Sequence, residues 1–138
     1  KPDQGHHHEV AGGVGMGAAL KLATNLMLGH LMAGFAEAVT LAARAGLDPK
    51  RLLEVLEAST FRSPWYQTKG AVVLQGDFSP HFALKHMRKD FELMAALARE
   101  LNTDLPVTEA VRRLFASAEE AGRGELDYSA IAAQLGTP

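Results

Sequence analysis

Three polar side chains near the start of the chain have types and spacing suited to a chemical role. Lys21, Thr24 and Asn25 occur at positions i, i+3 and i+4, so on a helix they share one face. A lysine amine beside an asparagine amide on a rigid helix is a candidate ligand-binding site. Gly17 lies on the same face, where the lack of a side chain lets a ligand approach closely. The other interpretation is a lysine stem that extends from a partly buried helix to solvent.

The element that must position these residues runs from Gly17 to Gly46. It contains no proline and is rich in Ala, Leu and Met, which predicts one helix about 45 Å long. Apolar side chains occur on nearly every side of it, and such a helix is expected to be buried at the centre of the fold. These apolar positions are Leu20, Leu22, Leu26, Met27, Leu31, Met32, Phe35, Val39 and Leu41.

The composition excludes several classes of protein. At 138 residues, with 47% hydrophobic and 22% charged residues, the chain is long enough for one globular domain. A formal net charge of −2 without runs of like charge gives no sign of a nucleic-acid surface. The absence of cysteine excludes disulfides and thiolate metal sites. It is also compatible with a reducing cytoplasm, which is the location we expect.

Neither a membrane span nor a metal site is expected. Lys21, Asn25, His30 and Glu37 interrupt the long apolar segment, which argues against a transmembrane helix. The first ten residues, KPDQGHHHEV, carry three adjacent histidines. Because no carboxylate or second histidine cluster stands at ligand spacing, we interpret residues 1–10 as a leader or the remnant of a tag.

The glycines before the long helix match a dinucleotide-binding pattern only formally. Gly13, Gly15 and Ala18 satisfy G-x-G-x-x-G/A, but a true fingerprint follows a strand and has an acidic residue at the end of a second strand. Nothing before Gly12 predicts a strand, and Glu37 lies inside the predicted helix. We therefore interpret these glycines as a flexible entry that lets another group press against the first turn of the helix.

Helix signals continue to the end of the chain, and no alternating apolar and polar run of strand length occurs. Gly46 fits a helix C′ position, Asp48 and Asp127 fit N-caps, and Pro106 fits a first turn. The sequence therefore predicts an all-α domain of five to six helices around one long central helix. The further helical segments are expected at about 49–59, 65–74, 82–102, 106–121 and 128–135.

The predicted helix over 82–102 has an apolar stripe and a charged face. Periodicity alone directs Lys89 away from the stripe and into solvent, while Asp90 lies on its flank. The stripe, which is expected to face the core, consists of Leu84, Met87, Phe91, Met94, Ala98 and Leu101.

Four blocks of sequence, taken in order, resemble the β-hydroxyacid dehydrogenases, the family that contains 3-hydroxyisobutyrate dehydrogenase. The resemblance covers residues 10–135, and four ordered blocks are more specific than any one of them. In the first block, Lys21 stands four residues before Asn25. The blocks are GGVGMGAALKLATN, FALKHMRKDFELMAAL, LPVTEAVRRLF and GRGELDYSAI.

Two details resemble the glyoxylate and succinic semialdehyde reductase branch of that family. One is the phrase FALKHMRKD, and the other is the single asparagine, Asn25, at the fourth position after Lys21. In the 3-hydroxyisobutyrate branch the third position is usually also Asn, whereas here it is Thr24. Two alternatives stay open: a 3-hydroxyisobutyrate or tartronate semialdehyde dehydrogenase, and a non-catalytic oligomerisation scaffold.

The resemblance implies the fold of the 6-phosphogluconate dehydrogenase C-terminal domain. Family members carry a Rossmann domain ahead of this region, so we expect residues 11–138 to be the helical domain for substrate binding and dimerisation, without its N-terminal Rossmann partner. A shell of short helices can hardly cover so long an apolar helix, so we also expect a homo-oligomer.

The implied reaction is hydride transfer between a nicotinamide and the carbinol or aldehyde carbon of a small hydroxy acid or aldehyde acid. The resemblance assigns the accompanying proton to Lys21, and Asn25 is expected to orient the amine or the substrate oxygen. A lysine gives up its proton near neutral pH only where its surroundings favour the neutral amine. Thr24 and Gly17 are expected to contact the substrate.

The implied cofactor is NADP or NAD, with NADP favoured, bound mainly by the Rossmann domain. In family members the lysine at the position of Lys89 lies near the cofactor. The solvated face predicted for Lys89 is therefore expected to point at that domain. Gly15 and Phe82 are expected to contribute to the same cofactor site.

The first prediction is that this chain alone is folded and helical but shows no cofactor-dependent turnover. The reason is that its helix signals are complete while the nucleotide-binding part of the family pattern is absent from its sequence. NADPH oxidation with glyoxylate, measured over a range of protein concentrations, checks this. Turnover that rises in proportion to the concentration of the chain would contradict it.

Overall fold

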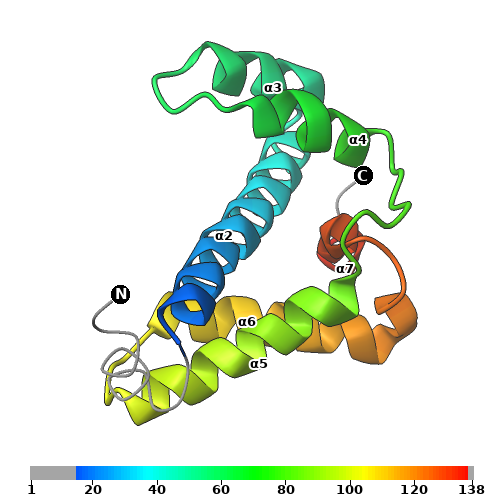
Figure 1. The fold of residues 1–138 in the computed structure, drawn as a ribbon. Coiled ribbons are helices and arrows are strands. Elements are labelled where there is room, and N and C mark those ends of the chain that lie inside the picture. The colour runs from blue at the N-terminus through cyan, green and yellow to red at the C-terminus, as the bar shows by residue number, and fades with distance from the viewer. Residues whose placement is uncertain (1–14, 137–138) are drawn as a thin grey trace.

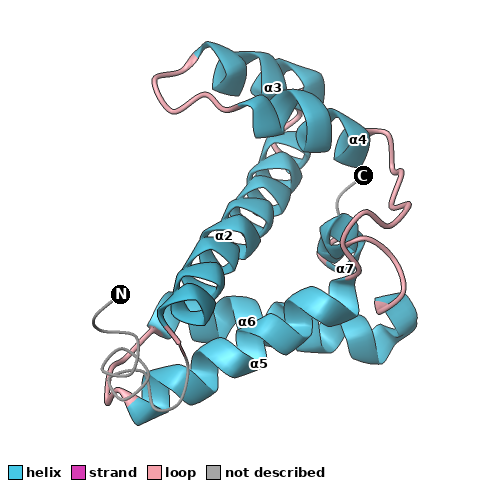
Figure 2. Ribbon diagram, viewed as in Figure 1, coloured by secondary structure: helices cyan, strands magenta, loops and turns pink. Residues whose placement is uncertain are grey.

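The computed structural model describes residues 15–136, and every regular element in that range is a helix (Figure 2). This confirms the predicted all-α class, including the long helix. The α-helices are α2 (Met16–Arg44), α3 (Pro49–Ala58), α4 (Ala71–Leu74), α5 (Leu84–Glu100), α6 (Pro106–Ala118) and α7 (Ile131–Gln134). Two π-helical turns, η1 (Tyr66–Gly70) and η2 (Glu119–Arg123), precede α4 and follow α6, and a 3₁₀ turn, η3 (Tyr128–Ala130), precedes α7.

The predicted helix boundaries are confirmed because they depend on local backbone chemistry. Gly46 follows α2 with a positive φ of 91°. The Asp48 side chain accepts a hydrogen bond from the N–H of Lys50 at the start of α3. α6 ends at Ala118 and the turn η2 follows it, but Gly122 breaks the helical conformation with a φ of 93°, directly after the predicted end at 121.

α2 spans the molecule, and the other helices gather at its two ends (Figure 1). α3, η1 and α4 lie at its C-terminal end, whereas α5 and α6 cross its N-terminal half. α7 packs against both α2 and α6. α2 therefore joins two groups of helices and fixes their separation.

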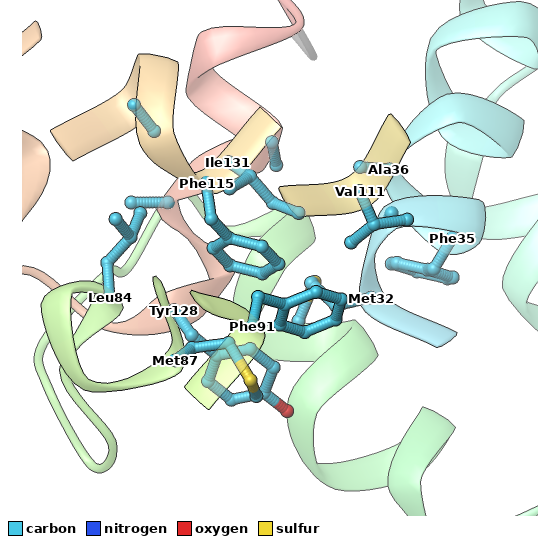
Figure 3. Close-up of a cluster of buried hydrophobic side chains, with 14 of the residues drawn as sticks. Met32, Phe35, Ala36, Leu84, Met87, Phe91, Val111, Phe115, Tyr128 and Ile131 are labelled. Atoms are coloured by element: carbon cyan, nitrogen blue, oxygen red, sulfur yellow. The ribbon is translucent and has the colours of Figure 1, made fainter. Parts of the chain in front are cut away.

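The core lies where α2, α5, α6 and α7 meet. Figure 3 shows Phe91 and Phe115 in this cluster, with ring centroids 5.4 Å apart. Phe91 also lies directly on the backbone of α2 at Gly29, where a Cβ atom would strike its ring. The close approach of α5 to α2 therefore depends on the missing side chain of Gly29.

The burial of α2 is less complete than its apolar sequence predicts. Met32 and Val39 are fully buried, but Leu20, Met27 and Leu41 are 67%, 67% and 73% exposed. The reason is that the described helices pack along one face of α2 only. By length and composition α2 is also apolar enough to cross a membrane, a test that the core helix of a globular protein passes as well.

We predict that Gly29→Ala lowers the free energy of unfolding by about 1 to 3 kcal/mol, because the added methyl group overpacks the contact with Phe91. Urea denaturation followed by circular dichroism measures the change. Gly17→Ala is the matched control in the same helix, since a Cβ there meets nothing within 4 Å. Equal stability of the two variants would contradict the packing assigned to Gly29.

Candidate functional site

A hydrogen bond between two helices fixes the asparagine of the predicted site. Asn25 Nδ2, on α2, donates to Asp90 Oδ2, on α5, over 2.7 Å. Asp90 is only 7% exposed, although the sequence pattern places it on the flank of its helix. A buried carboxylate needs a hydrogen-bonding partner, and Asn25 is that partner. The contact therefore holds the carboxamide in one orientation.

Two lysines flank this contact and leave their amines free. Lys21 lies one turn before Asn25 on α2, and Lys89 directly precedes Asp90 on α5. Both lysines are exposed, and within residues 15–136 no hydrogen bond or ion pair holds either amine. The structure thus brings Asn25 and Asp90 together at the crossing of α2 and α5, with Lys21 one turn away along α2 and Lys89 adjacent to Asp90 along α5. Two positive charges beside a fixed amide form a surface suited to an anionic ligand.

The remaining residues predicted on α2 are exposed at its first turns. Thr24 donates its hydroxyl to the carbonyl oxygen of Leu20 over 2.9 Å, which leaves the hydroxyl oxygen as an acceptor. A side chain at Gly17 would meet nothing within 4 Å, so any close approach there comes from outside the described residues. Gly15 is the N-cap of α2 and provides no side chain to cap the first N–H groups.

Phe82 lies apart from this cluster. It precedes the first residue of α5 and stands eight residues before Asp90, about 12 Å along the helix direction. Its ring is half-buried and packs edge-on against Tyr128, with centroids 6.1 Å apart. Phe82 is therefore positioned by the C-terminal part of the chain and not by α2.

The backbone N–H of Phe82 donates to the carboxylate of Asp127, which accepts more hydrogen bonds than any other carboxylate in the described part of the chain. Asp127, only 1% exposed, was predicted as an N-cap, and it does accept from the backbone N–H of Ser129 over 3.1 Å. Asp127 also forms an ion pair with Lys69, whose Nζ lies 2.8 Å from Asp127 Oδ2. The other donors are the N–H groups of His81 and Phe82, at 3.0 and 3.1 Å, and the hydroxyl of Ser129, at 2.6 Å.

These contacts keep Asp127 ionised. Burial alone raises the pKa of a carboxyl group, but the hydrogen bonds from Lys69, Ser129 and the two backbone N–H groups lower the pKa of Asp127 to about 2. The Asp127 charge is therefore present throughout the physiological range. The sequence reveals the cap but not the ion pair, because Lys69 lies 58 residues earlier.

Between residues 15 and 136, no three His, Cys, Asp or Glu side chains gather in a group that could hold a metal ion. The histidines at positions 6 to 8, interpreted from sequence as part of a leader or tag remnant, lie outside the described residues.

The family model described as "NAD-binding of NADP-dependent 3-hydroxyisobutyrate dehydrogenase" matches residues 15–135. Glyoxylate/succinic semialdehyde reductase 2, chloroplastic, from Arabidopsis thaliana is 37% identical over 120 residues, which cover 87% of this chain and 34% of the reductase. The cytokine-like nuclear factor N-PAC from Anopheles gambiae is 41% identical over 120 residues, which cover 87% of this chain and 21% of that protein. The chain thus spans about a third or less of the length of these relatives.

A solved structure has the same fold. The crystal structure of 3-hydroxyisobutyrate dehydrogenase from Salmonella typhimurium superposes with a TM-score of 0.81 and 32% sequence identity. The match covers 87% of this chain and 42% of that one. The fold and the sequence similarity therefore extend over the same part of the chain.

We predict that Asp127→Asn lowers the free energy of unfolding at pH 7 by about 3 to 5 kcal/mol, because it leaves the largely buried Lys69 ammonium unpaired. The folded pKa of Asp127, about 2, lies below its value of 3.8 in an unfolded chain. Its contribution is therefore complete above that unfolded value and is lost as the pH falls toward 2. Urea unfolding measured between pH 2 and 7 checks both effects.

Asp77→Asn is the matched control, because Asp77 is exposed and its carboxylate accepts hydrogen bonds only from Ser79 among the described residues. It should leave the stability at pH 7 nearly unchanged. An Asp127→Asn variant that is as stable as this control, with the same acid dependence, would show that the ion pair has no structural importance.

Proposed function

The chain belongs to the 3-hydroxyisobutyrate dehydrogenase-like family, as its C-terminal NAD-binding domain, and from this premise we propose a function. It contributes the residues that transfer the proton in an NAD(P)-dependent oxidoreductase. The proposed substrate is a small hydroxy acid or aldehyde acid of the glyoxylate or succinic semialdehyde type. The observation that carries the proposal is the free amine of Lys21 beside an asparagine whose orientation is fixed by Asp90.

Asn25 has the hydrogen-bonding capacity that this role requires. Its Nδ2 group gives one of its two N–H bonds to Asp90, which leaves a second N–H and the carbonyl oxygen available. The oxygen can accept from the Lys21 ammonium or from a substrate hydroxyl one helical turn away. Asp90 therefore acts as a positioning residue, because it fixes which edge of the amide faces Lys21.

Lys21 is proposed to hold the proton that accompanies hydride transfer. The nicotinamide, when bound, supplies the hydride chemistry. As a carbonyl is reduced, negative charge develops on its oxygen, and an ammonium group aimed at that oxygen both stabilises the charge and donates a proton. Because Lys21 is exposed in this chain, exclusion of water from the reaction has to come from the nucleotide-binding domain.

The cofactor is proposed to lie against the exposed side of the α2–α5 crossing. Lys89 is free to pair with a phosphate or carboxylate there, and Gly15 leaves the first N–H groups of α2 without a side-chain cap. We propose NADP as the preferred cofactor, and the matched family model, which is described for NADP-dependent enzymes, supports this choice. Phe82 is proposed to contact a more distant part of the same cofactor.

Two other functions compete with this proposal. A 3-hydroxyisobutyrate or tartronate semialdehyde dehydrogenase would use the same residues on a different acid. A non-catalytic scaffold is favoured by one observation, the 41% identity to a relative whose name describes a nuclear factor. A scaffold has no use for an amine beside a fixed amide, so the effect of replacing Lys21 separates the two classes.

We predict that Lys21→Ala, in an enzyme that joins this chain to its nucleotide-binding domain, lowers kcat by about 10² to 10⁴-fold with little change in cofactor affinity. The fold should survive, because the replaced side chain is exposed. Asn25→Ala should cost less, since Asn25 orients the reacting groups without transferring the proton. Steady-state kinetics with glyoxylate and succinic semialdehyde measure the effect.

Lys50→Ala is the matched control, because Lys50 is an exposed lysine on α3, away from the α2–α5 crossing. It should leave kcat unchanged. If the folded Lys21→Ala variant keeps more than about a third of the original kcat, Lys21 is a solvent-exposed lysine without a catalytic role.

A further inference from the structure

Two hollows lie beside each other where α5 ends, α6 begins and α2 makes its first turns (Figure 1). One has a volume of about 140 Å³ and the other of about 280 Å³. Their linings share Ala98, Thr103 and Leu105, so the two hollows adjoin. Neither Lys21 nor Asn25 lines either of them. The hollows therefore do not belong to the site assigned to proton transfer.

The smaller hollow is apolar. Leu22 and Leu26 line it from α2, and Met94 and Leu97 line it from α5. Thr103 is the one residue with a polar side chain in its lining. In another protein, an apolar cavity of about 150 Å³ lined by similar side chains binds benzene. The smaller hollow therefore matches an apolar group about as large as a phenyl ring.

The larger hollow carries two opposite charges that remain available to a ligand. Arg99 and Asp104 both line it and are exposed. Within residues 15–136 no hydrogen bond or ion pair joins either side chain to another group. The other two charged residues of its lining, Glu109 and Arg112, already pair with each other over 2.8 Å. One positive and one negative charge are therefore left beside the apolar hollow.

The apolar hollow lies on a different side of α2 from the Lys21 amine. Leu22 and Leu26 stand about 100° and about 140° around the helix axis from Lys21. They nevertheless directly follow Lys21 and Asn25 in the chain. A ligand in this hollow therefore contacts the same two turns of α2 that carry the candidate site, without occupying that site.

We propose that the two hollows form a binding site for a free α-amino acid with a large apolar side chain, such as phenylalanine. The side chain occupies the apolar hollow, the carboxylate pairs with Arg99 and the ammonium group pairs with Asp104. A simple carboxylate would bring its charge beside Asp104, and a simple amine would bring its charge beside Arg99, so each would meet a like charge. A zwitterion satisfies both groups at once.

Titration of the isotope-labelled chain with L-phenylalanine, followed by NMR of the backbone amides, tests the site. We expect a dissociation constant of about 0.1 to 1 mM, as for a small ligand whose two charged contacts are exposed to solvent. The shifted amides should lie mainly within residues 19–26 and 94–105. L-Alanine has the same charges but cannot fill the apolar hollow, so it should bind at least about tenfold more weakly. The absence of saturable shifts, or shifts confined to other parts of the chain, would overturn the proposal.

Two charge variants, titrated with three ligands, test the assignment of the charged groups. Arg99→Gln should weaken the binding of phenylalanine and phenylpropionate by about three- to tenfold and leave that of phenethylamine unchanged. Asp104→Asn should weaken phenylalanine and phenethylamine by a similar factor and leave phenylpropionate unchanged. Glu100→Gln is the matched control, because Glu100 is exposed next to Arg99 but does not line the hollow. Phenylpropionate that binds the original chain as tightly as phenylalanine, or equal effects on all three ligands, would overturn the assignment of a zwitterion.

Ala19→Leu tests the place of the apolar side chain. Ala19 is half-buried and lines the apolar hollow, so a leucine there fills it while keeping a good helix former in α2. The affinity for phenylalanine should fall by at least about tenfold. Ala18→Leu, at an exposed neighbouring position outside the lining, should leave it unchanged. A folded Ala19→Leu variant that binds phenylalanine as tightly as the original chain would overturn the proposal, and if this variant does not fold, the surface variants at Arg99 and Asp104 decide.

Discussion

The arrangement of the site depends on the buried carboxylate of Asp127. It receives hydrogen bonds from η1, from the segment before α5 and from η3, and so ties together three parts of the chain that are distant in sequence. Because it holds the backbone just before α5, it sets where that helix begins and therefore where Lys89 and Asp90 meet α2. Breaking a buried ion pair is costly, since the remaining charge is left without a partner. The geometry at Asn25 is thus supported by a contact made just before α5 begins, fewer than ten residues ahead of Asp90.

α2 differs between its buried and exposed faces. Gly29 admits the ring of Phe91 from the core, whereas a Cβ atom at Gly34 would meet nothing within 4 Å. Lys21 is exposed near the start of the same helix, and Asn25 reaches across to Asp90 on α5. A single helix therefore holds the candidate site in register with the core.

Much of the fold could be predicted from the sequence because its signals are local. Gly46 and Asp48 mark helix ends through the conformation and hydrogen bonding of their own neighbourhood, and the structure confirms them. The pairing of Asn25 with Asp90 could not be predicted, since it joins residues 65 positions apart through the crossing of two helices. The same limit explains Leu101, predicted for the core but 46% exposed, because periodicity cannot show where the partner helix ends.

The central claim is that the Lys21 amine transfers the proton, and chemical rescue tests it most directly. In an enzyme that joins this chain to its nucleotide-binding domain, the Lys21→Ala variant would be assayed with small primary amines such as methylamine and ethylamine. Activity should return in proportion to amine concentration, with a rate that varies with the basicity of the amine. Amines that leave the activity of the folded variant unchanged, while fitting the space vacated by the lysine, would contradict proton transfer by Lys21.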